Sequence, residues 1–424
     1  MKLKSPSEQI LISSLSLQIV LYIASLLGVG YPLIEFLFTG RGAYGDFIDG
    51  LILTPIYYHP DLGQDGSFSQ PNAPMTILLY RALRFFFPSL AVTNWASVNW
   101  VPVLTLLIFF LIIIVLLLRK VSVSTVTSIV LTFSYPMLFL FGRANPDIFC
   151  LILFLAFILS FNSKKFFLCA IIIAIIGSIK LPFFFISLSF IFVKKLNVFI
   201  GSVILLPIFF FLPLVWFEHP FLSQVNSLQR VAQNYHRDYV LGEAGSMFNN
   251  SFYGLLKIIN YTLIDNKSPN AGELLIINES IVQLHNFMVV LVLAIFVFMV
   301  KKLEIVNTNK NLSRDQLLRL ILILTSLSIL LPYISADYRL TFLLPPIAAL
   351  LADRKLDTVS AILVGLLFLP KSFYSFEFNS QFMGTHFFSS ALNPIILSFI
   401  VITQFRVLMT MKNNSTPLGF KAKK

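Results

Sequence analysis

Long apolar stretches recur along almost the whole of this 424-residue chain. Many of them reach about 20 residues, the length that an α-helix needs to cross the roughly 30 Å hydrocarbon core of a membrane. Because a backbone in lipid must satisfy its own hydrogen bonds, such stretches predict helices. Charged residues make up only 12% of the chain, against about 25% in soluble proteins. The sequence therefore predicts an all-α, polytopic membrane protein.

We expect a bundle of about ten to twelve transmembrane helices, some of them short or re-entrant, in a single domain that comprises residues 1–424. Two longer segments, about residues 39–94 and 218–285, are expected to be loops on the outer face. Residues 70–86 in the first loop have apolar residues around Arg81 and Arg84, which predicts an amphipathic helix in the membrane interface. The expected spans are residues 10–38, 95–118, 121–142, 146–162, 166–179, 181–193, 197–217, 286–300, 317–334, 339–352, 357–370 and 388–411.

Basic pairs follow alternate spans and indicate the orientation of the chain. The positive-inside rule places these pairs, together with both termini, in the cytoplasm. The net charge of +12 then reflects membrane topology, and no nucleic-acid partner is expected. The predicted location is the plasma (inner) membrane, with the lipid bilayer as the first partner. The pairs are Arg119-Lys120, Lys164-Lys165, Lys194-Lys195, Lys301-Lys302 and Arg354-Lys355.

Residues 166–193 have a lysine pair at each end, so both ends are expected on the cytoplasmic side. The stretch before Lys180 is too short to cross the membrane, and Pro182 favours a break in the helix. We therefore expect an inverted V of two short helices with Lys180 at its apex. Two interpretations of Lys180 stay open: it binds an anionic group of a substrate, or it snorkels or closes an internal ion pair.

Two short turns are expected to place further polar side chains at the outer surface, as candidate substrate contacts. Ordinary solvated turn residues are the alternative for each of them. Asp147 could also simply begin the next helix, where an acid suits the helix dipole. The candidates are Arg143, Asn145 and Asp147 in "GRANPD", and Asp337, Tyr338 and Arg339 in "ADYRL".

Two acids near the start of the first outer loop, Asp46 and Asp49, are the candidate catalytic carboxylates, with solvated loop acids as the alternative. Carboxylates opposite cations suit transfer of a group from an activated phosphate. The cations stabilise the leaving phosphate, and a carboxylate takes the proton from an attacking hydroxyl. Because the outer face has no nucleotide pool, the donor would be a lipid phosphate. His236 in "NYHRDY" is a further candidate substrate contact.

Taken in order, these motifs resemble those of the GT-C superfamily of integral-membrane glycosyltransferases. They are most similar to glycosyltransferase family 87, the polyprenol-phosphate-mannose-dependent mannosyltransferase type. The doubled proline of that pattern is "PNAP" here, and the spacing from lysine to proline is shorter. The corresponding segments are "GDF" at Asp46, "QPNAPMTILLY" from Gln70 to Tyr80, "GRANPD" from Gly142 to Asp147, "KLP" from Lys180 to Pro182 and "DYRL" from Asp337 to Leu340.

The resemblance implies an inverting transfer of a sugar, mannose in the family's own case, from a polyprenyl-phosphate donor. The acceptor would be a glycolipid or an envelope glycan on the extracytoplasmic face, as in envelope-polysaccharide synthesis. Asp46 would be the general base, and Lys180, Arg143 and Arg339 would bind the lipid phosphate. Asp46 and Asp49 do not form a DxD pair, so we expect no metal, and no cofactor is expected either.

Two other classes of protein fit the same composition. A polymerase or ligase of the O-antigen type would rely on outer arginines and a histidine more than on an early aspartate. A polytopic transporter of an anionic substrate would use the broken helix at Lys180 as a binding site. The outer-end clustering of the polar residues and the absence of an evident internal repeat favour the glycosyltransferase.

Overall fold

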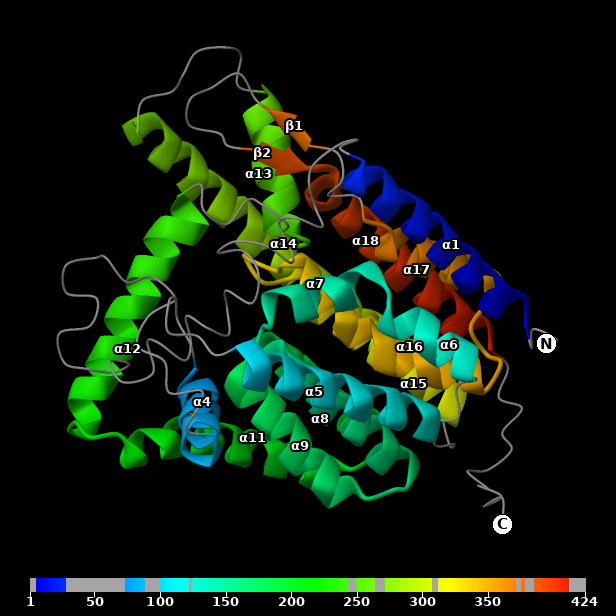
Figure 1. Cartoon of the computed structure of the whole chain (residues 1–424), viewed down its shortest axis with the longest axis horizontal. Coiled ribbons are helices and arrows are strands. Elements are labelled where there is room, and N and C mark those ends of the chain that lie inside the picture. Colours follow the sequence, from blue (N-terminus) through cyan, green and yellow to red (C-terminus); the bar gives the residue numbers. More distant parts are fainter. Residues whose placement is uncertain are drawn as a thin grey trace.

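The computed structural model describes residues 5–27, 73–87, 100–121, 124–242, 249–263, 271–306, 312–370, 375–377 and 385–411. This part of the chain is almost entirely helical (Figure 1). Asp46 and Asp49, with most of the first expected outer loop, lie outside the described residues.

The elements follow one another with short connections. In the first half they are α1 (Pro6–Leu26), α4 (Pro74–Phe86), α5 (Trp100–Lys120), α6 (Thr125–Thr132), α7 (Tyr135–Arg143), α8 (Asp147–Asn162), α9 (Phe166–Ile179), the 3-10 helix η4 (Leu181–Leu188), α10 (Ser189–Phe192), α11 (Leu196–Phe211) and the 3-10 helix η5 (Leu212–Trp216). In the second half they are α12 (Phe221–Tyr235), the π-helix η6 (His236–Leu241), α13 (Phe252–Leu263), α14 (Ala271–Val306), α15 (Arg314–Leu330), the 3-10 helix η7 (Asp337–Leu343), α16 (Leu344–Ala352), α17 (Thr358–Phe368), the paired strands β1 (Ser375–Glu377) and β2 (Thr385–Phe387), and α18 (Phe388–Thr410).

Several of these helices are long and apolar enough to cross a membrane, so the chain is a multi-pass membrane protein. Five pass this test, and the bent pair α6–α7 makes a sixth if its two helices, which meet at 54°, form one broken span. Pro136 stands in the first turn of α7 and accounts for the break, because a proline cannot continue the hydrogen bonding of a helix. The five are Pro6–Ala24, Val101–Lys120, Leu196–Trp216, Ile277–Phe298 and Ser390–Thr410.

The other apolar helices are shorter than a full span, which is where the fold differs from the simplest expectation of ten to twelve spans. Helices α8, α9 and α17 and the unit η4–α10 have between 10 and 17 residues. Helix α15, although expected as a span, is an internal helix: every residue from Gln316 to Leu330 is buried. Three of its hydroxyls, on Thr325, Ser326 and Ser328, donate to carbonyls four residues earlier, which allows their burial among apolar side chains.

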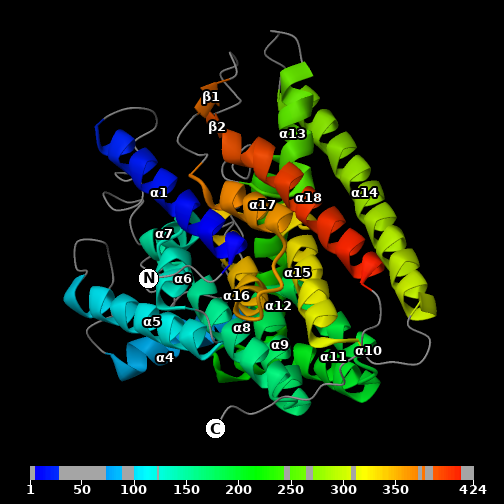
Figure 2. The same cartoon turned by 90° about the vertical axis from the view of Figure 1, so that its right-hand side faces the viewer.

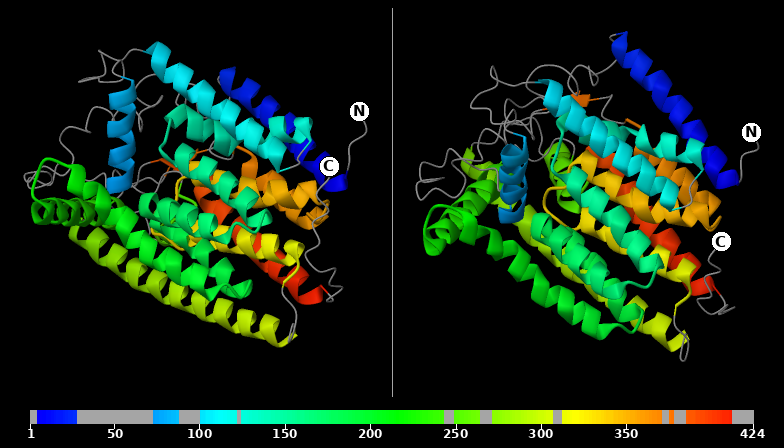
Figure 3. Two further views of the ribbon diagram at one scale, coloured as in Figure 1. Left: turned by 90° about the horizontal axis from the view of Figure 1, so that it is seen from below. Right: turned by 60° about the horizontal axis from the view of Figure 1, so that its bottom comes forward.

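Two groups of helices enclose α15. On one side α1, α17 and α18 pack in that order, with α18 directly against α15 (Figure 2). On the other side α5, α8, α9 and α11 pack side by side, and η4 reaches α15 (Figure 3). Aromatic stacking joins the second group to the chain that follows α15, because the Phe183 ring lies 3.9 Å from the Phe342 ring, centroid to centroid.

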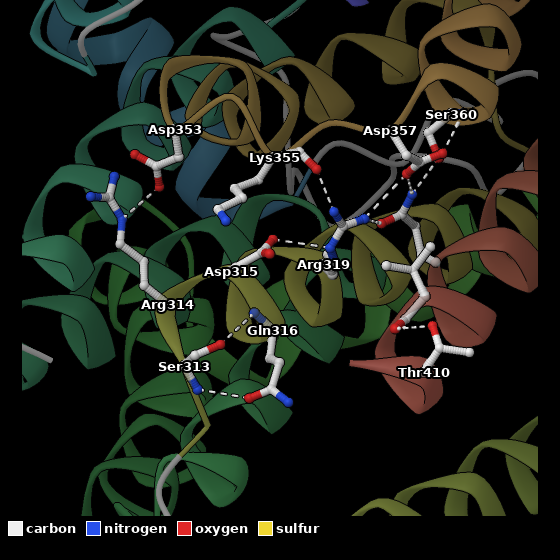
Figure 4. Close-up of polar contacts among 12 residues, drawn as sticks. Ser313, Arg314, Asp315, Gln316, Arg319, Asp353, Lys355, Asp357, Ser360 and Thr410 are labelled. Carbon is white, nitrogen blue, oxygen red and sulfur yellow. Dashed lines mark hydrogen bonds and ion pairs between the residues drawn. The ribbon is translucent and has the colours of Figure 1, made fainter. Parts of the chain in front are cut away.

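A buried polar network joins α15, α17 and α18 at one end of the molecule (Figure 4). The guanidinium of Arg319 is only 3% exposed as a residue, and its Nε contacts Asp315 at 3.0 Å. The same guanidinium contacts Asp357 at 3.2 Å and donates to Gln404 Oε1 at 2.8 Å and to the Lys355 carbonyl. Because each donor of this buried cation has an acceptor, the charge is compensated and three helices are tied together.

Asp357 also caps α17, since its carboxylate accepts the Ser360 amide at 2.9 Å. Burial alone would raise the pKa of Asp357. Hydrogen bonds from Ser360, Arg319 and Gln404 outweigh burial and hold that pKa below its usual value. The start of α1 reaches the same place, because Ser7 Oγ donates to the Leu356 carbonyl at 2.7 Å.

The chain thus has two distinct ends. At the basic end lie the turns after α8, α10 and α16, which carry Lys164-Lys165, Lys194-Lys195 and Arg354-Lys355. At the opposite end, which we call the site end, lie the turn before α8, the junction of α9 with η4, and η7. The alternation of ends that the charges predict is therefore present in the folded chain.

Candidate functional site

The first component of the site is the turn that joins α7 to α8. Helix α7 ends with Ala144 in the left-handed region (φ 47°), and the Asn145 amide closes the turn on the Leu140 carbonyl at 3.2 Å. The side chain of Asn145 accepts the Asp147 amide at 3.0 Å. This turn orients the Asp147 carboxylate at the start of α8, where it is completely buried.

Lys180 supplies the partner of that carboxylate. Its Nζ lies 3.1 Å from Asp147 Oδ1, and the lysine side chain keeps an exposed fraction of 21%. The second interpretation from the sequence, an internal ion pair, is therefore present in the structure. A buried carboxylate requires such a cation, since an isolated charge would be strongly disfavoured there.

The hairpin around Lys180 has the form predicted from the sequence. Helix α9 ends at Ile179, and Pro182 stands in the first turn of η4. After the apex the chain folds back on itself: a Cβ at Gly177 would lie 3.1 Å from Phe184 Cβ. At the other end the Lys195 ammonium lies 5.5 Å from the centre of the Phe166 ring. The two ends of the segment thus lie together and Lys180 is at the turn between them.

The "ADYRL" segment brings the third component. Asp337 is buried and accepts the Tyr135 hydroxyl at 2.8 Å. The Tyr338 ring stacks on Phe139, with centroids 6.1 Å apart and an interplanar angle of 20°. Both contacts attach η7 to α7, so the two outer turns singled out in the sequence are neighbours in the fold.

Arg339 follows directly and lies next to Lys180. The two cations interact electrostatically, and Tyr338 interacts with Lys180 in the same way. One guanidinium nitrogen of Arg339 donates to the Ile334 carbonyl, whereas its Nε is buried without a hydrogen-bond partner among the described residues. Within the same part of the chain, Arg339 forms no ion pair with a carboxylate. The site therefore has a cation whose charge its described neighbours do not balance.

Tyr235, at the end of α12, is part of the site although sequence reasoning missed it. Its hydroxyl lies within electrostatic reach of both Arg339 and Lys180. Burial raises the pKa of Tyr235, and the two cations oppose that rise. Its ring stacks on Tyr239, with centroids 4.9 Å apart. The signal available in the sequence was the spacing of these two tyrosines, which puts them on one face of a helix.

A second missed group, "NNS" at residues 249–251, positions η7 from behind. Asn249 pairs with Ala336 in a β-bridge, and its side chain accepts the Ser335 amide at 2.8 Å. The Asn249 amide group donates to the Tyr333 carbonyl at 2.9 Å. Gly254 leaves the necessary space, because a Cβ there would lie 2.8 Å from Asn249 Cγ. Asn249 is thus a brace for the chain that leads into the site.

Of the predicted site residues, the structure brings together Asn145, Asp147, Lys180, Tyr338 and Arg339. Asp337 joins them through Tyr135, as described above. Arg143 is half-buried in the last turn of α7. His236 is exposed at the start of η6, where its ring lies 6.1 Å from that of Tyr333.

The charges and geometry at this end suit an anion rather than a metal ion. Among the described residues, no three His, Cys, Asp or Glu side chains form a group that could hold a metal. Asp147 is engaged by Lys180 and Asp337 by a tyrosine hydroxyl, which leaves the Arg339 guanidinium as the available charge. A guanidinium presents several donors in a plane and is well suited to phosphate or carboxylate oxygens.

Comparison of the chain with protein-family models, with curated proteins and with solved structures finds no match in any of the three.

Proposed function

We propose that this multi-pass membrane protein is a glycosyltransferase that uses a polyprenyl-phosphate sugar as donor and acts at the site end. The observation that supports this proposal best is the position of Arg339. Its guanidinium lies beside Lys180 at the apex of a proline-broken hairpin and has no described carboxylate partner. Two adjacent cations at the end of a helical bundle suit the phosphate of a membrane-dissolved donor.

The proposed reaction is a single displacement at the anomeric carbon of the donor sugar. An acceptor hydroxyl forms the new bond to that carbon while the bond from the carbon to the phosphate oxygen breaks, which inverts the configuration. The proton of the hydroxyl passes to a carboxylate, and the electron pair of the broken bond stays on the polyprenyl phosphate. Asp46 is our candidate for the base, with Asp49 as its competitor. No cofactor is required by this scheme.

The described residues have separate roles in this proposal. Arg339 binds the phosphate through its planar donors, and Lys180 adds a second positive charge. Asp147 is a positioning residue that holds the Lys180 ammonium in place. Tyr235 and His236 lie where α12 continues into η6 and are candidates for contacts to the sugar or the acceptor. Mannose is the first sugar to test, and glycolipids or envelope glycans are the first acceptors.

The test is transfer of radiolabelled sugars from a panel of polyprenyl-phosphate donors to envelope-lipid acceptors by the purified full chain. Arg339→Gln is expected to lower transfer about 10²–10³-fold, as expected for loss of a group that stabilises the leaving charge. Arg339→Lys is expected to recover only part of the activity, because an ammonium lacks the planar fork. Arg237→Gln, at an exposed arginine outside the site, is the matched control and is expected to transfer normally.

The base has its own pair of variants. Asp46→Asn is expected to lower transfer about 10²–10⁴-fold, and Asp49→Asn much less. Full activity of Asp46→Asn would place the base elsewhere. Absence of transfer from every donor, together with uptake of an anionic substrate into proteoliposomes, would overturn the glycosyltransferase in favour of a transporter. Chain elongation of a preassembled lipid-linked glycan would instead indicate a polymerase or ligase of the O-antigen type.

A further inference from the structure

The basic end of the chain has a second assembly of cations, formed by the two turns that carry Lys164-Lys165 and Lys194-Lys195. The turns have the same geometry. Lys164 has φ 57° and Lys194 has φ 56°, both in the left-handed region. In each turn the amide of the second lysine closes on a carbonyl five residues earlier: Lys165 on Ser160 at 2.9 Å, and Lys195 on Phe190 at 2.9 Å.

Lysine is an unfavourable residue for the backbone at these positions. Glycine is the usual residue where a helix ends in the left-handed region, because a Cβ is strained there. Among the described residues, the others with this conformation that are not glycine are Arg354 and Ala144. All three such turns at the basic end therefore carry a cation at the strained position, whereas the turn at the site end carries a neutral residue.

The two lysine turns form one surface. Below them the rings of Phe161, Phe166 and Phe190 pack together, with centroids 5.7 Å apart for the first pair and 6.3 Å for Phe161 and Phe190. The Lys195 ammonium lies 5.5 Å above the centre of the Phe166 ring. The four lysine side chains are exposed. This group, Lys164, Lys165, Lys194 and Lys195, is called the lysine platform below.

Little compensates the charge of the lysine platform. Lys165, Lys194 and Lys195 form no ion pair within the described part of the chain. The third turn with the same backbone is different: Asp353 precedes Arg354 directly, and Asp357 lies three residues further on. The platform is thus a local excess of positive charge, and the Arg354 turn is not.

We propose that the lysine platform binds the headgroup of an anionic phospholipid in the leaflet that faces the basic end. Apolar side chains beside the turns are exposed where acyl chains would lie: Phe167 is 75% and Leu196 is 55% exposed. Leu196 also begins the membrane-spanning segment formed by α11 and η5. Cations next to lipid-facing apolar side chains match an amphipathic ligand, and each lysine near a membrane surface strengthens binding to anionic lipid about fivefold. This inference does not depend on the proposed function.

The test measures the thermal unfolding of the full chain in neutral detergent with added phosphatidylglycerol or phosphatidylcholine, together with bound lipid counted by native mass spectrometry. Phosphatidylglycerol is expected to raise the unfolding temperature more than phosphatidylcholine does. The double variant Lys164→Gly/Lys194→Gly is expected to lose most of this difference and to bind phosphatidylglycerol about 25-fold more weakly. In detergent without lipid it is expected to be at least as stable as the parent, since glycine relieves both strained positions.

The matched control is Arg354→Gly against Lys194→Gly, because both remove one positive charge from the same backbone conformation. We expect only Lys194→Gly to reduce the effect of phosphatidylglycerol. An equal reduction in both variants would indicate a general charge effect and overturn the proposal, as would a double variant that keeps the full response. Equal stabilisation of the parent by inorganic phosphate would also overturn it in favour of a soluble anion. If the double glycine variant does not fold, Lys165→Gln/Lys195→Gln gives the same test without a change at the strained positions.

Discussion

At the scale of single residues, the pair Asp147 and Lys180 determines how charge is held inside the helical bundle. The carboxylate is completely buried, and the lysine that meets it at 3.1 Å retains some exposure. Removing one member of a buried pair strands the other charge, whereas removing both leaves no charge to stabilise. Arg339, next to the pair, is the cation that remains available to an anionic ligand.

Asp147→Asn is expected to lower the free energy of unfolding by up to about 3 kcal/mol, because it leaves Lys180 without its carboxylate. The double variant Asp147→Asn/Lys180→Met is expected to lose less than the sum of the two single variants, since no unpaired charge is left. Thermal unfolding in detergent gives the three values. Strict additivity would mean that the two side chains do not interact.

At the scale of elements, the hairpin of α9 and η4 depends on close approach of two helices. Gly177 is the contact point: a Cβ there would lie 2.9 Å from Leu206 of α11 and 3.1 Å from Phe184 Cβ of η4. The leucine methyl can move, but the phenylalanine Cβ is attached to the backbone and cannot move independently. The absence of a side chain at Gly177 therefore lets α9 pack against η4 and α11 simultaneously.

Gly177→Ala is expected to destabilise the protein by about 1–3 kcal/mol through overpacking at this contact. Gly201 of α11 offers the matched control, because nothing lies within 4 Å of a Cβ at that position. Gly201→Ala is expected to stabilise the protein by about 0.5–1 kcal/mol, as alanine favours a helix over glycine. Unfolding temperatures that shift in the same direction in both variants would contradict the close packing at the hairpin.

At the scale of the whole molecule, the separation of the two ends provides the context for both proposals. The lysine platform and the Arg319 network lie at the basic end, and Asp147, Lys180 and Arg339 lie at the site end. Helices that connect the ends, such as α8 and α9, are short for a full span, so both polar groups remain close to the membrane interfaces. The positive-inside rule then assigns the basic end to the cytoplasm.

This orientation predicts the outcome of labelling with a membrane-impermeant maleimide in intact cells. Cys150 and Cys169 are completely buried, so the parent chain is expected to react little. Arg237→Cys, at the site end, is expected to react in intact cells, and Ser163→Cys, at the basic end, only after permeabilisation. The reverse pattern would place the site end in the cytoplasm and exclude the proposed donor chemistry on the outer face.

Part of the candidate site could be predicted from the sequence, and part could not. The importance of Lys180, Asp147 and the "ADYRL" turn followed from short motifs at the ends of apolar stretches, because such turns must lie near a membrane surface. Asn249 and Tyr235 were missed. They act on partners distant in sequence, as Asn249 does on the chain before η7, and no local pattern identifies which loop will pack there.

The amino-acid sequence by itself determined that this chain is a helical, multi-pass membrane protein, that its basic pairs lie at one end, and that residues 166–193 turn back at Lys180. Each of these follows from hydropathy, charge or a proline, which act over a few residues. Only the tertiary structure decided that Lys180 pairs with Asp147, that Tyr135 binds Asp337 across a separation of 202 residues, and that α15 is enclosed by other helices. Those outcomes depend on which apolar faces pack together, and that is a property of the whole bundle.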